Sequence, residues 1–63
     1  RRSRLLAAIR TLPLPQREVV TLALEELSHE EIAQVLDLTA SNVAVRLHRA
    51  KARLKEILEA GDG

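Results

Sequence analysis

The glycines of this 63-residue chain, Gly61 and Gly63, are confined to its last three residues. Tight turns between antiparallel strands depend chiefly on glycine, because it accepts positive φ angles without steric cost. No segment alternates apolar and polar residues over a useful length, whereas apolar residues recur at intervals of three and four. The sequence therefore predicts an all-α fold, a small three- to four-helix bundle.

Length and composition limit how such a bundle is held together. A chain of 63 residues buries only about 60% of the surface that it exposes when unfolded. It contains no Phe, Trp, Tyr, Met or Cys, so its core must consist of Leu, Ile, Val and Ala without disulfides. We expect one domain of marginal stability over residues 1–63.

Two helices are expected in the first half of the chain. Apolar spacing predicts a short helix over residues 3–11, which Pro13 ends, and Pro15 suits the first position of the next helix. The apolar residues of the first helix are Leu5, Leu6, Ile9 and Leu12. Those expected to face the core from the second are Val20, Ala23, Leu24 and Leu27, with Val19 and Leu22 widening the stripe.

The widened stripe of the second helix indicates a partner-binding surface. Apolar surface beyond what neighbouring helices cover on a small domain often marks an interaction site. We therefore predict that a protein partner covers Val19 and Leu22, with the acidic residues Glu25 and Glu26 at the rim.

The second half of the chain predicts a helix-turn-helix over about residues 28–59. Ser28 and Glu31 fit a capping box at the start of a helix over about residues 28–36. Its expected core residues are Ile32, Ala33 and Leu36. A three-residue turn follows, after which Thr39 caps a long helix from Ala40 to about Glu59 that Gly61 is expected to terminate.

The long helix has an apolar face between two basic shoulders. At 100° per residue other apolar residues fall within about 60° of Val43; they are Leu47, Ala50, Leu54, Ile57 and Leu58. One shoulder consists of Asn42, Arg46, Arg49 and Arg53, and the other of Lys51 and Lys55. Opposite the core lie Ser41, Val45, His48 and Ala52. A helix with one packed face and a basic, polar remainder suits the major groove of DNA.

Charge is unevenly distributed, although the net charge is only +1. Residues 1–10 contain four Arg and no acidic residue, residues 11–37 carry a net charge of −5, and residues 38–58 carry +4. The basic segment favours a polyanionic partner, and the acidic segment a second, different one. The alternative is a solvated helix face whose cations complement the helix dipole.

Several classes of function are disfavoured. The apolar run after Arg4 ends at Arg10, too soon for a secretory signal or a membrane span, so we expect a cytoplasmic protein without a membrane partner. Ala33 stands four residues after His29, where a zinc-protease motif requires a second His. With no nucleophile–base pair and no Gly-rich phosphate loop, the sequence predicts no enzyme, no metal site and no cofactor.

Three segments between about Leu12 and Leu58 form one pattern, in order and with fitting spacing. They are Leu12-Pro13-Leu14-Pro15-Gln16-Arg17-Glu18-Val19-Val20, then Leu27-Ser28-His29-Glu30-Glu31-Ile32-Ala33, and then Asn42-Val43 with Arg46-Leu47-His48-Arg49-Ala50. In these segments the chain resembles region four of bacterial sigma factors, their C-terminal promoter-recognition domain, most of all in the extracytoplasmic-function group. Helix-turn-helix regulators of the LuxR type usually diverge in the last of these segments.

This resemblance implies that the chain is a fragment of an alternative sigma factor. In that family the region binds the minus-35 element of double-stranded promoter DNA and docks on the β flap of RNA polymerase, and anti-sigma factors often sequester it. The flap or an anti-sigma factor would cover the partner surface of the second helix. The DNA-facing residues that the family implies are Ser41, Asn42, Ala44, Val45, Arg46, His48 and Arg49. Thr39 and Ser41 can offer hydroxyls and amides to a phosphate, and Arg53 extends the basic shoulder.

The chain departs from the family pattern at the expected DNA face. Ser41-Asn42 replaces a common Gly-Thr, and Ala44-Val45 replaces a common Lys or Arg followed by Ser. Ala44 and Val45 either contact thymine methyl groups or mark a divergence toward protein binding. His48 is either a DNA contact or an exposed polar residue. The alternatives are a sigma-like module bound by an anti-sigma factor without DNA contact, and a LuxR-type transcription regulator.

Overall fold

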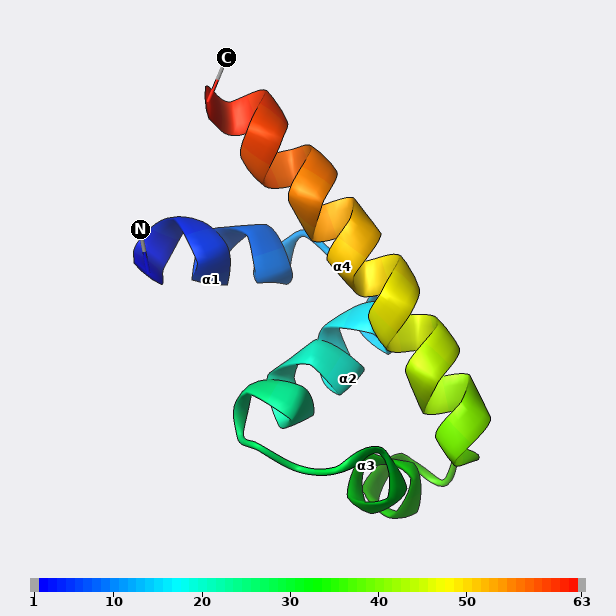
Figure 1. Cartoon of the computed structure of the whole chain (residues 1–63). Coiled ribbons are helices and arrows are strands. Elements are labelled where there is room, and N and C mark those ends of the chain that lie inside the picture. The colour runs from blue at the N-terminus through cyan, green and yellow to red at the C-terminus, as the bar shows by residue number, and fades with distance from the viewer. Residues whose placement is uncertain (1, 63) are drawn as a thin grey trace.

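The computed structural model of the chain describes residues 2–62, and side chains from residue 4 to residue 61. This range contains no strand and four helices: α1 (Arg2–Arg10), α2 (Leu14–Leu24), α3 (His29–Leu36) and α4 (Ala40–Asp62). Figure 1 shows α4 as one long helix, with α3 at its N-terminal end and α1 toward its other end. α4 contacts all three other helices, and α2 also contacts α1 and α3. The prediction of an all-α fold is confirmed.

A short break separates α1 from α2. The amide of Leu12 donates to the carbonyl of Ile9 at 3.0 Å, which tightens the end of α1 into a 3₁₀-type turn. Pro13, with a ψ of 148°, has extended geometry and precedes α2 directly. Because α2 begins at Leu14, Pro15 lies at its second position, where an amide donor is not needed. The break was predicted, and the helix start is one residue earlier than expected.

The start of α3 is held by the predicted capping box. The amide of Ser28 donates to Oε1 of Glu31 at 2.7 Å, and the amide of Glu31 donates to Oγ of Ser28 at 3.1 Å. At the other end Asp37 adopts the left-handed conformation, with φ 58° and ψ 49°. The amide of Leu38 then reaches back to the carbonyl of Ala33 at 2.8 Å. This left-handed residue turns the chain sharply into α4.

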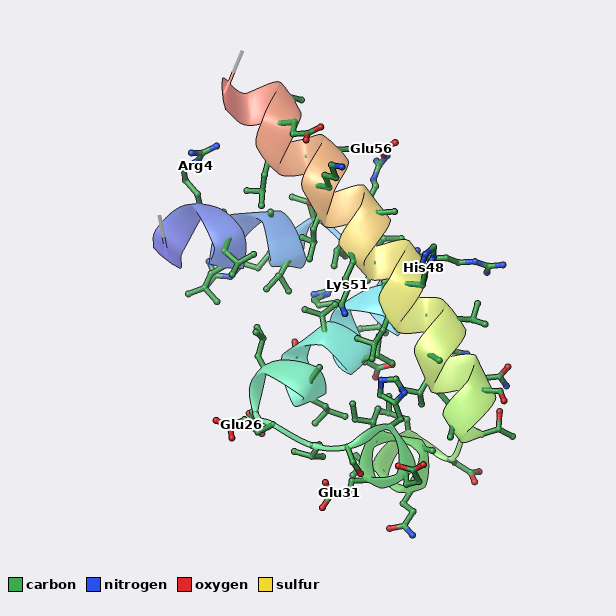
Figure 2. The ribbon with its side chains drawn as sticks, viewed as in Figure 1. Arg4, Glu26, Glu31, His48, Lys51 and Glu56 are labelled. Atoms are coloured by element: carbon green, nitrogen blue, oxygen red, sulfur yellow. The ribbon has the colours of Figure 1, made fainter. Side chains whose placement is uncertain are left out.

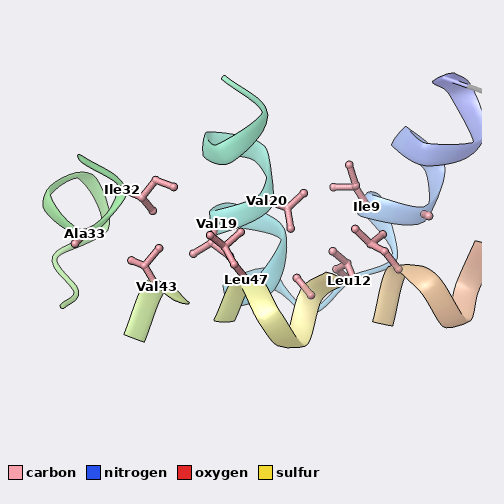
Figure 3. Close-up of a cluster of buried hydrophobic side chains, with 11 residues drawn as sticks. Ile9, Leu12, Val19, Val20, Ile32, Ala33, Val43 and Leu47 are labelled. Carbon is pink, nitrogen blue, oxygen red and sulfur yellow. The ribbon is translucent and has the colours of Figure 1, made fainter. Parts of the chain in front are cut away.

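One apolar core joins the four helices (Figure 3). Its buried residues are Ala8, Ile9, Leu12, Val19, Val20, Ile32, Ala33, Val43, Leu47, Ala50 and Leu54. Only Leu, Ile, Val and Ala contribute, as the composition requires. From α4 the core takes four of the six predicted residues, and the other two, Ile57 and Leu58, pack against it partly buried. The predicted inner face of α4 is therefore confirmed.

The core of α2 differs from the prediction. Leu24, expected to face the core, is 55% exposed, whereas Val19, expected at a partner surface, is completely buried. α2 contacts α1, α3 and α4. The side chains that these three helices bury are therefore not the ones that a single apolar stripe along α2 predicts. Leu6 of α1 is likewise 50% exposed. The prediction that a partner covers Val19 is wrong.

The C-terminal end of α4 also differs. Gly61 was expected to end the helix, but α4 continues through it to Asp62. Nη2 of Arg4 donates to the carbonyl of Leu58 at 3.2 Å, which ties this end of α4 to α1. Glycine is a weak helix former but is tolerated within a helix. Contacts with α1 can therefore extend α4 beyond Gly61.

Candidate nucleic-acid interface

The residues predicted to contact DNA lie along the solvent side of α4 and just before it. Those that are exposed are Thr39, Ser41, Asn42, Ala44, Val45, His48, Arg49 and Arg53. Arg46 is half-buried. Figure 2 shows side chains along the whole length of α4, including those of His48 and Lys51. Since Val43, in the same turns, is completely buried, α4 has a packed inner face and an exposed outer face.

The first turn of α4 is capped by Thr39. Its Oγ1 accepts from the amide of Asn42 at 3.1 Å, and its carbonyl accepts from the amide of Val43 at 3.0 Å. The amides of Ala40 and Ser41 have no carbonyl within the helix to bond. They carry the positive end of the helix dipole, and the Thr39 hydroxyl keeps its hydrogen for donation. A phosphate at this end would meet several donors.

The arginines of α4 form one side of the outer face. Arg49 is exposed, and Arg53 pairs with Glu56 one turn further on, with 3.6 Å between Nη1 and Oε1. Both side chains of this pair are largely exposed, at 61% and 72%. Exposed pairs contribute little to stability, so a phosphate can displace Glu56 from Arg53. Arg46, on the same side of the helix, is half-buried.

The centre of the outer face carries no lysine or arginine. It consists of Ser41, Val45, His48 and Ala52, all of them exposed. Val45 is 45% exposed even though it is apolar and β-branched. Ala44 lies beside this row and is exposed as well. The arrangement therefore offers small, apolar and hydrogen-bonding side chains in the middle, with cations on either side.

A separate apolar groove of about 190 Å³ lies between α1, α2 and α4. It is lined by Leu5, Ile9, Val20, Ala23, Leu24, Leu47, Lys51 and Leu54. The sequence did not predict this groove, because Leu24 was expected to be buried in the core. The periodicity of α2 carries no signal that separates Leu24 from its buried neighbours, since the groove exists only where three helices meet.

The remaining predicted partner residues lie elsewhere on α2. Leu22 is half-buried and lines a second groove of about 310 Å³ between α2 and α3. Glu25 and Glu26 are exposed at the end of α2, and Glu26 has a φ of 69°. Leu22 therefore faces α3, while Leu24 faces the groove beside α1.

Residues 2–62 show neither a metal site nor a membrane-spanning helix. No cluster of three or more His, Cys, Asp or Glu side chains in this range could hold a metal ion. None of its helices has the length and apolar character to cross a bilayer. His29, at the start of α3, is exposed.

Comparison with known proteins gives consistent matches. The family model described as Sigma-70, region 4 matches residues 2–54. The chain is 45% identical over 62 residues to the RNA polymerase sigma-E factor of Streptomyces antibioticus, a match that covers 97% of the chain and 34% of that relative. It is 44% identical over 62 residues to the sigma-E factors of Streptomyces avermitilis and Streptomyces coelicolor, covering 97% of the chain and 35% of each relative. The chain thus spans about a third of the length of these relatives. No solved structure matches it.

Proposed function

The chain belongs to the sigma-70 region 4 family, and we propose that it recognises the minus-35 element of promoter DNA for an alternative RNA polymerase sigma factor. The observation that carries this proposal is the division of α4 into a buried inner face and an exposed outer face flanked by cations. α4 lies in the major groove in this proposal, with its outer face on the base edges and its arginines on phosphates. α3, fixed by its capping box and the turn at Asp37, supports α4 from behind.

The proposed sigma factor is longer than the chain. Residues 1–63 serve as one helix-turn-helix domain of it, in keeping with the third of each relative that the match covers. The domain acts in the cytoplasm by binding, without catalysing a reaction, since its family is a DNA-binding region of transcription initiation.

We place the docking site of the polymerase β flap in the groove between α1, α2 and α4. Leu24 and Leu5 present apolar surface there, and Lys51 supplies a cation at the edge. The groove uses Leu47 and Leu54 from the inner side of α4, whereas the DNA face uses its outer side. Promoter DNA and polymerase therefore bind at the same time, and an anti-sigma factor that covers the groove blocks the polymerase. Leu22, in the groove between α2 and α3, stays a candidate contact of a protein partner, with Glu25 and Glu26 at the rim of that contact.

Sequence-specific binding of the chain to duplex DNA tests the DNA-binding part of this proposal. Selection from a random duplex library at low salt is expected to enrich one short sequence. The alternative is a protein-interaction module without DNA contact. The observation that would fit it is the exposed apolar side chain of Val45, which a protein partner could cover. A chain that retains no duplex from the library would exclude DNA recognition and support that module. Association with core polymerase then distinguishes a sigma domain from a LuxR-type regulator, for which none is expected.

A further inference from the structure

The outermost row of side chains on α4, which has no lysine or arginine, lies between two rows that do. Around the helix axis, Ser41, Val45, His48 and Ala52 fall within about 60° of one another, opposite the core. Arg49 and Arg53 lie on one side of this row, and Lys51 and Lys55 lie on the other; all four are exposed. A helix seated in the major groove meets base edges at its outermost row and phosphates at its flanks. The outermost row of this helix therefore has the chemistry that reads the bases.

That chemistry excludes the commonest way of reading guanine. Arginine and lysine bind guanine O6 and N7, whereas alanine, valine and the threonine methyl group contact the 5-methyl group of thymine. Val45 is 45% exposed and Ala44 is exposed beside it, so both methyl-bearing side chains are available. Neither contributes to the core, and valine is a weaker helix former than alanine. The fold therefore gives no reason for an apolar, β-branched side chain at position 45.

We propose that Val45, with Ala44 beside it, reads the 5-methyl group of thymine, so that the preferred DNA carries a T·A pair opposite Val45. This inference rests on the proposed function, and it specifies which bases the domain selects. Ser41 and His48 lie one turn to either side of Val45 and can hydrogen-bond to the neighbouring base edges. They are seven positions apart, about 10 Å along the helix axis, which corresponds to about three base pairs. Specificity is thus concentrated in about three consecutive pairs, with thymine at the centre.

Replacing thymine by deoxyuridine tests this directly, because the change removes only the 5-methyl group. The duplex is the sequence that the wild-type chain enriches from a random library, and each thymine is replaced in turn while Kd is measured by fluorescence anisotropy. At one or two positions we expect deoxyuridine to weaken wild-type binding about fourfold, the effect of one buried methyl group. In Val45→Ser, which removes both γ-methyl groups of the side chain, the same replacement should change Kd by less than about half of that factor.

Val35→Ser is the matched control, since Val35 is an even more exposed valine, at 61%, on α3. It should keep the full response to deoxyuridine. If the wild-type chain binds its selected sequence without any response to deoxyuridine, or if Val45→Ser keeps the full response, the inference fails while the proposed function stands. If the chain retains no duplex at all, the proposed function fails as well.

Discussion

Ile32 of α3 and Val43 of α4 lie next to each other in the core, and both side chains are completely buried (Figure 3). They come from the two helices of the helix-turn-helix, on either side of the turn at Asp37. Their packing fixes how α3 lies against α4, and so which side of α4 is left exposed.

Shortening Ile32 should reduce stability in proportion to the volume removed. Ile32→Val is expected to lower the free energy of unfolding by about 1 kcal/mol, and Ile32→Ala by about 3 kcal/mol. The whole domain has a stability of about 6 kcal/mol at typical values per residue. Val35→Ala, at a 61% exposed position of the same helix, serves as the control and should change little. Urea unfolding followed by circular dichroism measures all three, and equal losses for Val35→Ala and Ile32→Ala would contradict the packing described.

The two glutamates after α2 should respond in opposite ways to glycine. Glu26 has a φ of 69°, where an L residue is strained, whereas Glu25 has a φ of −87°. Glu26→Gly should therefore raise the free energy of unfolding by about 1 kcal/mol, and Glu25→Gly should lower it by about 0.5 kcal/mol. Each change removes one negative charge, so charge is matched between the variants. Thermal melts followed by circular dichroism should show the two midpoints moving apart, and a shift in the same direction for both would count against the strain at Glu26.

Loss of Arg49 should weaken binding to all DNA sequences alike. Arg49→Ala removes one phosphate contact in the proposed complex, so the plot of log K against log salt should become shallower by about one unit. Arg10→Ala removes an exposed arginine from α1, away from the outer face of α4, and should leave the slope unchanged. An unaltered slope and affinity in Arg49→Ala would remove this residue from the interface.

A charge in the α1–α2–α4 groove should interfere with polymerase. Leu24→Lys places a cation among the apolar residues of the groove and is expected to weaken association with the β flap at least tenfold, because burying an unpaired ammonium is costly. Leu14→Lys is the matched control, since Leu14 is equally exposed, at 56%, but lines the groove between α2 and α3. Binding of both variants to DNA should match wild type. Normal flap association by Leu24→Lys would move the docking site elsewhere, and Leu14→Lys would then indicate whether the α2–α3 groove holds it.

Sequence predicted the parts of the fold that depend on near neighbours in the chain. The capping box of Ser28 and Glu31 spans three residues, and both of its hydrogen bonds are present. The inner face of α4 repeats every three or four residues over about three turns, so Val43, Leu47, Ala50 and Leu54 were correctly assigned to the core. Such features are encoded locally, and packing does not alter them.

The predictions of burial were wrong where several helices together decide which side chains are covered. Val19 and Leu24 are both apolar residues of α2, but three neighbouring helices bury the first and leave the second in an open groove. The predicted end of α4 was wrong for a related reason. The hydrogen bond from Arg4 to Leu58, which ties this end of α4 to α1, joins residues 54 positions apart, so the local sequence gives no sign of it. The candidate DNA residues are still predictions, because exposure places them on one surface without showing what binds there.

The separation of the two faces of α4 has an evolutionary consequence. Every residue that α4 gives to the core lies on its inner side, so the outer row can change without loss of stability. In the proposed complex, a single substitution at position 41, 45 or 48 would then alter the preferred ligand while the fold and the α1–α2–α4 groove persist. After gene duplication, copies of such a domain can acquire distinct targets in a few steps, each of which remains a folded protein.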